Sequence, residues 1–231
     1  GGEVREPFPG VVLGNPNGKT VLVEFTDYNC PYCEASLKDV NRLIAEDPDL
    51  KVVIREWPIF EGSDVASRMA LAAGLQGKYR AFHDAMFATG DVTAAAKAAG
   101  LDMARAERDA ASDAVSTEIA RSRAVEAQSL GAGMVMMMPP YHGALLKADE
   151  QGMIEHFKQV ADACGIPIIL QDAPLSGVTL TVPFMVRLAK EVPLVRYFKI
   201  EVPGTANKLR ALIEAGGDAV VGPFDGEEAI T

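Results

Sequence analysis

Hydrophobic and polar positions at the start of the chain predict a strand, a helix and a second strand. Residues 21–25 form a short apolar run that is typical of a strand. After Cys33, apolar residues recur at helical spacing until Asp47 and Pro48 end the pattern. Residues 52–57 form another apolar run and predict the second strand.

The rest of the chain changes character twice. Residues 64–130 are rich in alanine and predict short helices, the last of them at 118–130, where Gly131 ends it. Residues 134–138 are a continuous apolar run, which is typical of a strand buried in a parallel sheet. Strand and helix patterns then alternate as far as residue 222, which predicts βαβ units on a parallel sheet.

Three single positions have simple structural interpretations. Cys164 shares an apolar helix face with Ile154 and Phe157, so we expect it in the core. We expect His83 and His156 at helix surfaces and not in a ligand set.

Composition narrows the classes of function. With 48% hydrophobic residues the chain is expected to build a packed core, and its net charge of −10 argues against a nucleic-acid partner. No apolar run approaches the ~18 residues that span a bilayer, so no membrane span is expected. The N-terminus lacks the features of a signal peptide. A periplasmic or other cell-envelope compartment is therefore expected if a signal was removed, and the cytoplasm otherwise.

The sequence Cys-Pro-Tyr-Cys at Cys30 and Cys33 carries the clearest candidate chemistry. A metal site usually needs a second cysteine pair or added histidines, so we expect neither a metal nor a cofactor. Disulfide exchange needs a thiol of lowered pKa, which a helix N-terminus provides. Pro31 suits the first helical position and would place Cys30 at the cap. Cys30 is then the expected nucleophile and Cys33 the resolving thiol; two small buried residues are the alternative.

Glu24 lies in the strand that leads to this pair. A carboxylate in an apolar strand costs free energy unless it is used or paired. It is a candidate to take a proton from Cys33 during exchange. The alternative is a glutamate that faces solvent from an edge strand.

These motifs resemble the DsbA-like branch of the thioredoxin-fold oxidoreductases. The resemblance runs through residues 21–34 (VLVEFTDYNCPYCE), 52–59 (VVIREWPI) and 76–86 (QGKYRAFHDAM). It implies a domain at 1–130 with a helical insertion at 64–130. It also implies an envelope enzyme that forms or isomerises disulfides in protein substrates together with a redox partner protein. The family's cis-proline loop, last two strands and last helix have no expected counterpart here.

Lys199 is a second candidate for chemistry. It lies between aromatic and apolar residues in the strand expected at 195–200, although lysine is seldom buried. Near the carboxyl end of a barrel strand, desolvation lowers the pKa of an amine and makes it a Schiff-base nucleophile. The alternative is a lysine whose stem lies along the strand end while its charge stays in water.

Three further motifs resemble the dihydrodipicolinate synthase and N-acetylneuraminate lyase family, with the closest likeness to its 2-keto-3-deoxy sugar acid dehydratases. They are residues 133–143 (GMVMMMPPYHG), 166–174 (IPIILQDAP) and 197–201 (YFKIE). The resemblance implies that residues 131–231 are strands four to seven of a (β/α)8 barrel.

The same resemblance implies a Schiff-base site. Lys199 matches the Schiff-base lysine, Tyr141 matches the tyrosine-containing loop after strand four, and Gln171 stands where the synthases carry a catalytic tyrosine. Four strands cannot close a barrel, so we expect no lyase activity from a monomer. A homo-oligomer through the barrel segment stays open.

The sequence therefore predicts an α/β fusion of two incomplete domains: a thioredoxin-like fold with a helical insertion, followed by a partial (β/α)8-barrel segment. The first hypothesis is a thiol–disulfide oxidoreductase that acts through Cys30 and Cys33. The second is a class I Schiff-base lyase or dehydratase of 2-keto acids that acts through Lys199. The third is an inactive fusion or fragment.

Overall fold

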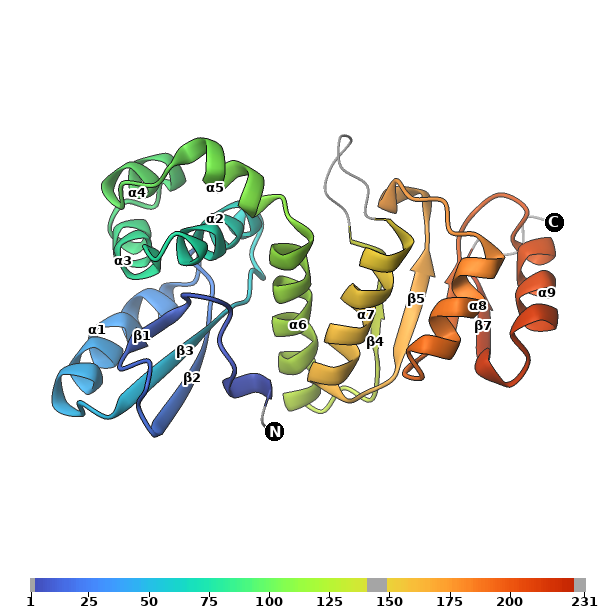
Figure 1. Ribbon diagram of the computed structural model, residues 1–231, viewed down its shortest axis with the longest axis horizontal. Coiled ribbons are helices and arrows are strands. Elements are labelled where there is room, and N and C mark those ends of the chain that lie inside the picture. Colours follow the sequence, from blue (N-terminus) through green and yellow to red (C-terminus); the bar gives the residue numbers. More distant parts are fainter. Residues whose placement is uncertain (1–2, 141–148, 227–231) are drawn as a thin grey trace. The chain divides into compact units, whose positions relative to one another are not determined.

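The structure is a computed structural model that describes residues 3–140 and 149–226 (Figure 1). The chain separates into two compact units, Gly1–Arg123 and Ala124–Thr231, here called the N-terminal and C-terminal units. The boundary that the sequence predicts between residues 130 and 131 stays a prediction. None of the described helices has both the length and the apolar character needed to cross a bilayer.

The N-terminal unit is built on a sheet with the strand order β1-β3-β2. Strand β1 (Val12–Gly14) runs antiparallel to the central strand β3 (Leu50–Glu56), and β2 (Thr20–Thr26) runs parallel to it. The register places Glu24 opposite Ile54. Nearly all of β3 is buried, whereas β2 is mostly half-buried because it pairs with only one neighbour in the described residues.

Helix α1 (Pro31–Glu46) joins the parallel strands β2 and β3 and starts where the sequence predicts. Cys30 caps it in an extended conformation, with φ −90° and ψ 115°, and Pro31 occupies the first helical position. The strand–loop–helix arrangement therefore brings both cysteines to the helix N-terminus.

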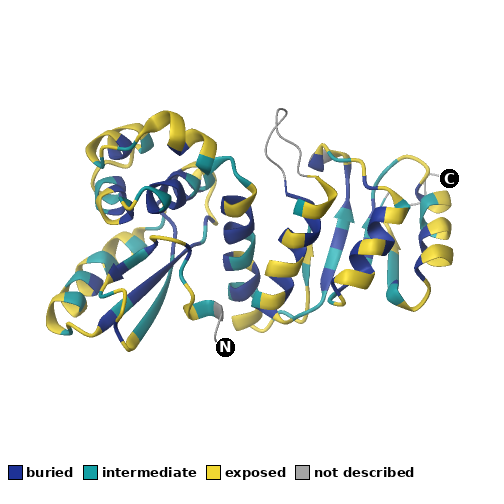
Figure 2. Cartoon of the chain, viewed as in Figure 1, coloured by how far each residue is buried: buried dark blue, intermediate teal, exposed yellow. Residues whose placement is uncertain are grey.

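Helices dominate the part of the N-terminal unit that follows β3. They are α2 (Ser63–Leu75), α3 (Tyr79–Thr89), α4 (Val92–Ala98), α5 (Met103–Ala110) and α6 (Asp113–Ser129), which runs past the boundary between the units. The small alanine side chains of α2 allow close packing, and most of that helix is buried (Figure 2). The last helix begins five residues before the start that the sequence predicts at residue 118, at Asp113.

The C-terminal unit contains a parallel sheet with the strand order β4-β5-β6-β7, in which helices alternate with strands. Its elements are β4 (Val135–Met137), α7 (Glu150–Cys164), β5 (Ile168–Asp172), α8 (Val182–Glu191), β6 (Val195–Ile200), α9 (Thr205–Gly216) and β7 (Gly222–Asp225). The βαβ alternation expected from the sequence is confirmed.

Burial alternates along the central strands of this sheet. Leu170 and Phe198 are fully buried on one face, whereas their neighbours Gln171 and Lys199 are half-buried on the other. The prediction that residues 134–138 are buried is wrong, because Met136 is 50% exposed and the methionines at both ends of this run are exposed as well. Among the described elements, helices pack on one face of the sheet, so only alternate side chains are covered (Figure 1).

Two expectations about histidine are also wrong. His83 and His156 are 2% and 3% exposed, so neither lies on a helix surface. Cys164 is buried in α7, which confirms its predicted place in the core.

Candidate functional site

The structure brings the two predicted redox residues together at the N-terminus of α1. Cys30 is the helix cap and Cys33 lies in the first turn; both thiols are free and half-exposed. The Cys33 thiol donates a hydrogen bond to the sulfur of Cys30. Tyr32, between them, is 85% exposed, so the rim of the site is open to a partner.

The environment of Cys30 favours its thiolate. Burial is the largest single influence and raises the pKa of this thiol. Hydrogen bonds from the Cys33 thiol and from the backbone N–H groups of Cys33 and Tyr32 together outweigh it, so the pKa of Cys30 is lowered. These N–H groups belong to the first helical turn, where they have no intrahelical acceptor.

Cys33 has the opposite character. Burial raises its pKa to about 11, and its hydrogen bond to Cys30 acts in the same direction. Hydrogen bonds from the Asp27 backbone and the Thr26 side chain lower the pKa by less. The two sulfurs are therefore unequal, with an acidic thiol outside and a weakly acidic thiol behind it.

Asp27 anchors the loop that carries the cysteines, a role that the sequence did not reveal. Its buried carboxylate accepts hydrogen bonds from the N–H groups of Ile59 (2.7 Å), Phe60 (3.0 Å) and Asn29 (2.7 Å) and from the Ser63 hydroxyl (2.6 Å). Burial raises the pKa of Asp27, but these four hydrogen bonds outweigh it, so the pKa is lowered. The bond to Asn29, two residues on, is a local Asx turn and the one signal visible in sequence.

Glu24 connects to the site through Ser36. The Ser36 hydroxyl lies 2.8 Å from Oε1 of Glu24 and 2.8 Å from the backbone oxygen of Cys33. Burial raises the pKa of Glu24, and the bond from Ser36 lowers it by less. Glu24 is thus a half-buried carboxyl with increased proton affinity on the strand behind α1.

The residues predicted for a Schiff-base site are partly brought together in the C-terminal unit. Gln171 and Lys199 are cross-strand neighbours on β5 and β6, and both contact Glu201: Lys199 by an ion pair and Gln171 by a hydrogen bond of 2.6 Å. The hydrogen bonds from Lys199 and Gln171 lower the pKa of Glu201. Tyr141 lies outside the described residues. Glu201 was not predicted, although it lies only two positions after Lys199, directly after the end of β6.

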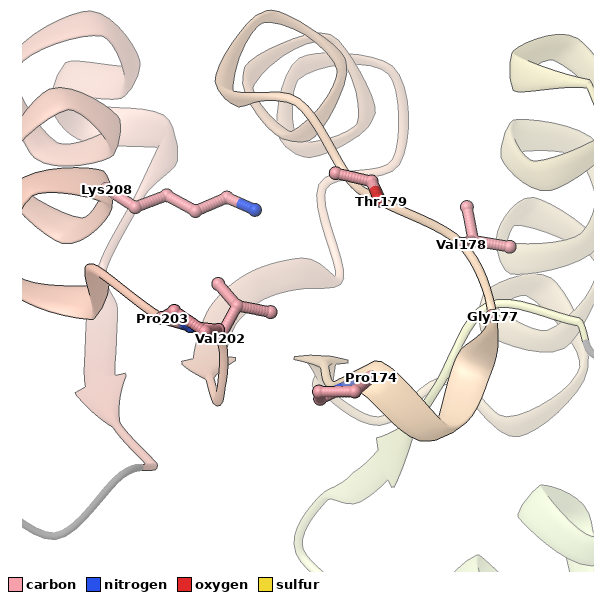
Figure 3. Close-up of a pocket in the computed structure, with 7 residues that line it drawn as sticks. All are labelled: Pro174, Gly177, Val178, Thr179, Val202, Pro203 and Lys208. Carbon is pink, nitrogen blue, oxygen red and sulfur yellow. The ribbon is translucent and has the colours of Figure 1, made fainter.

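A pocket of about 500 Å³ opens beyond the carboxyl ends of β5 and β6 (Figure 3). It is lined by Pro174, Gly177, Val178, Thr179, Val202, Pro203 and Lys208. Lys208, on α9, forms a 2.6 Å ion pair with the buried Asp172 at the end of β5. Gln171, Lys199 and Glu201 do not line this pocket. Within residues 3–140 and 149–226, no group of three acidic, histidine or cysteine side chains is arranged to hold a metal ion.

Comparison with known proteins divides the chain at α6. Residues 21–133 match the family described as "DSBA-like thioredoxin domain". A solved thioredoxin-like oxidoreductase from Silicibacter pomeroyi DSS-3 is 48% identical, with a TM-score of 0.48, over 52% of this chain and 73% of its own. The thiol-disulfide exchange protein α-DsbA2 from Wolbachia pipientis is 28% identical, with a TM-score of 0.47, over 53% and 70%.

Residues 110–227 match the "Dihydrodipicolinate synthetase family". L-2-keto-3-deoxyarabonate dehydratase from Azospirillum brasilense is 57% identical over 116 residues, which are 50% of this chain and 38% of that protein. 4-Hydroxy-tetrahydrodipicolinate synthase from Helicobacter pylori (strain HPAG1) is 31% identical over 45% of this chain and 33% of its own length. The chain thus spans about a third of the length of these curated relatives.

Both matches agree with the resemblances seen in the motifs and confirm the predicted fold class, a thioredoxin-like fold with a helical insertion followed by a partial barrel. The curated relatives that match the C-terminal half are enzymes. The two matched ranges overlap in residues 110–133, which include α6. The chain belongs to the dihydrodipicolinate synthetase family through residues 110–227, and its residues 21–133 form a DSBA-like thioredoxin domain.

Proposed function

We propose that the protein is a thiol–disulfide oxidoreductase in which Cys30 attacks and Cys33 resolves. The observation that carries the proposal is the inequality of the two thiols at one helix N-terminus. The pKa of Cys30 is lowered, and that of Cys33 is raised to about 11. A thiolate at neutral pH is the attacking species in exchange, and a resolving thiol should stay protonated until it is needed.

The exchange proceeds in two balanced steps. The Cys30 thiolate attacks one sulfur of a substrate disulfide, forms a mixed disulfide with it and releases the other sulfur as a thiolate, which takes a proton. The Cys33 thiol then loses its proton and attacks the Cys30 sulfur. The substrate leaves as a dithiol and the Cys30–Cys33 disulfide remains. In the reverse direction the same steps oxidise a substrate dithiol.

Glu24 is the proposed proton acceptor for Cys33. Its raised pKa suits a group that takes a proton from a thiol and returns it. Ser36 contacts both the Glu24 carboxylate and the Cys33 backbone, and so links the carboxyl to the residue that carries the second thiol. The proposed substrates are protein thiols and disulfides, with a second redox protein to restore the starting state. A cell-envelope compartment, where disulfides persist, is part of the same proposal.

Mass spectrometry of the intact chain tests the assignment. With glutathione disulfide as the probe, Cys33→Ser is expected to accumulate one glutathione on Cys30, because the resolving thiol is missing. Cys30→Ser is expected to accumulate little, because the thiol of high pKa remains. Cys164→Ser is the matched control, since that thiol is buried in α7, and it should leave the reaction unchanged. Equal labelling of the Cys30→Ser and Cys33→Ser variants would contradict the assignment.

A second candidate function is Schiff-base chemistry at Lys199. The cluster of Lys199, Gln171 and Glu201 and the match to the dihydrodipicolinate synthetase family favour it. The ion pair with Glu201 opposes it, because an amine must lose its proton before it attacks a carbonyl. Borohydride reduction in the presence of pyruvate separates the possibilities. A covalent adduct on Lys199 that Lys199→Arg abolishes would support the lyase, and an unmodified chain would remove it.

A further inference from the structure

A buried polar cluster lies behind the cysteine loop and has no part in the exchange steps. Tyr28 and Tyr79 each place a hydroxyl within hydrogen-bond distance of both Glu56 and His83. The distances to Oε1 of Glu56 are 3.0 Å from Tyr28 and 2.8 Å from Tyr79. The distances to Nδ1 of His83 are 3.0 Å and 3.2 Å. Each of the two tyrosine hydroxyls thus connects the acid Glu56 to the base His83.

The cluster is sealed from water. Glu56 is fully buried, Tyr79 and His83 are 1% and 2% exposed, and Tyr28 is 8% exposed. Aromatic rings close one side: the ring of Tyr28 packs edge-on against Phe82 (6.3 Å between centroids), while Phe87 lies 4.9 Å from it. A charge in such a site is expensive unless it is paired.

The elements that surround Glu56 and His83 offer little charge compensation. The titratable, charged or hydrogen-bonding groups that act on them are Asp27 and Tyr28 from the cysteine loop, Ser67 from α2, and Tyr79, Arg80 and Asp84 from α3. Asp27 disfavours the ionised form of Glu56, and no cation is among its influences in the described residues. The uncharged cluster is therefore the form that this environment stabilises.

The positions of the protons follow from the same burial. Burial raises the pKa of Glu56 to about 8 and lowers the pKa of His83 to about 4. At neutral pH the acid holds its proton and the imidazole is neutral. Both phenols donate to Oε1 of Glu56, so their oxygens are left to accept from His83, and the imidazole proton belongs on Nδ1.

We propose that Glu56 is a positioning residue of the thiol site, which keeps a proton in a buried cluster with Tyr28, Tyr79 and His83 and thereby fixes the loop before Cys30. The inference rests on the proposed function of Cys30. Tyr28 lies two residues before Cys30, and its neighbour Asp27 accepts the Cys30 N–H through its backbone oxygen (3.1 Å). When Glu56 loses its proton, a buried carboxylate remains that must be hydrated. The loop that carries Tyr28 is the segment that moves to admit water.

Two titrations of the reduced full chain test this inference. Carbon-13 NMR of the glutamate carboxyl groups should show one that titrates near pH 8 in the wild type and is missing in Glu56→Gln. Tyr79→Phe removes a hydrogen bond that favours the carboxylate, so it should move this titration upward. The rate of Cys30 alkylation by iodoacetamide should show its own ionisation step and a second step near pH 8. Glu56→Gln should keep the first step and lose the second.

The possible results separate this inference from the proposed function. A Glu56 that titrates near the ordinary glutamate value, or alkylation curves of identical shape in the wild type and Glu56→Gln, would overturn the role of Glu56 while leaving Cys30 as the nucleophile. A missing low-pKa step of Cys30, with the Glu56 titration intact, would overturn the proposed function instead. If Glu56→Gln does not fold, a Tyr79→Phe titration that fails to move upward overturns the cluster by itself.

Discussion

Two cysteines three positions apart acquire different chemistry from their immediate neighbours. Cys30 is the acceptor of hydrogen bonds from the first helical turn, whereas Cys33 is the donor in the bond between them and lies deeper. Asp27 acts on both in different ways: its backbone contacts Cys33, and its carboxylate raises the pKa of Cys30 by charge. Asp27 therefore stabilises the loop by its hydrogen bonds, while its negative charge raises the pKa of the nucleophile Cys30.

Asp27→Asn separates these two effects. The amide cannot accept all four hydrogen bonds of the carboxylate, so we expect the free energy of unfolding to fall by about 3 kcal/mol, as the loss of charge-assisted bonds implies. The negative charge also disappears, so the pKa of Cys30 should fall further. Urea unfolding and the pH dependence of alkylation measure the two quantities. A stable variant, or one in which the pKa of Cys30 rises, contradicts the role given to Asp27.

Acid provides an internal check on the same variant. Because the folded pKa of Asp27 is lowered, its stabilisation is present above its unfolded value and disappears as the pH falls through the folded value. The difference in unfolding free energy between the wild type and Asp27→Asn should therefore shrink in acid. A difference that stays constant from neutral pH to acid would exclude a charge-dependent anchor.

At the level of whole elements, a buried ion pair joins β3 to α6. Arg55 and Glu118 are 1% and 2% exposed and form an ion pair, and Arg121 adds a second contact to Glu118 at 3.1 Å. Arg55 also donates to the backbone oxygens of Val4 and Glu6. Burial nevertheless raises the pKa of Glu118, so desolvation outweighs the pairing. The ion pair therefore fixes the position of α6 against β3 and adds little to the free energy of unfolding.

Removal of one partner is therefore expected to cost more than removal of both. Glu118→Leu removes the carboxylate that pairs with a buried guanidinium and should lower the unfolding free energy by about 3–5 kcal/mol. The double variant Arg55→Met/Glu118→Leu should cost less than the sum of the two single changes. Asp39→Asn, which breaks the exposed Arg42 pair, is the control and should cost under about 1 kcal/mol. Additive costs in the double variant would refute this coupling.

Some of the helices and strands could be predicted from sequence patterns, and others could not. Helix α1 and its cap follow from local signals, because proline and the cysteine spacing act within one turn. The methionine run at 134–138 predicts a buried strand, yet Met136 is half exposed, because burial on both faces depends on elements far away in the chain. A continuous apolar run cannot show how many of its faces will be covered.

Across the molecule, long-range contacts decide the features that the sequence did not reveal. Glu56, Tyr79 and His83 come from β3 and α3 and meet only after the sheet and the helices have packed. The sequence predicts a surface position for His83, because a single histidine in a helix gives no sign of a buried partner. The cysteine pair was predictable, since its chemistry depends on adjacent residues. The roles of the Asp27 and Glu56 carboxyl groups could not be predicted, since those roles depend on tertiary contacts.

The buried acid and base also make stability depend on pH. Glu56 has a raised folded pKa, so its contribution is full below its unfolded value near 4.5 and is lost as the pH rises through about 8. His83 has a lowered folded pKa of about 4, so between about 4 and 6.5 stability increases with pH. The two effects oppose each other up to about pH 6.5. Above it, Glu56 alone lowers stability by ~1.4 kcal/mol per pH unit until about pH 8.

Glu56→Gln isolates this dependence. The wild type should lose stability relative to the variant between about pH 6.5 and 8, and the difference should level off above that range. The single tryptophan, Trp57, lies next to β3, so its fluorescence follows unfolding of the N-terminal unit. Parallel stability curves for the two proteins over this range would show that Glu56 is not a buried proton carrier.

The most direct measurement of the central claim is the titration of the two thiols in the reduced full chain. Thiolate absorbance and alkylation rates of the wild type, Cys30→Ser and Cys33→Ser give the pKa of each sulfur. The account predicts a pKa for Cys30 below the ordinary thiol value of 9.0 and a pKa for Cys33 near 11. A Cys30 that titrates at or above the ordinary value, or two thiols that titrate together, would contradict it.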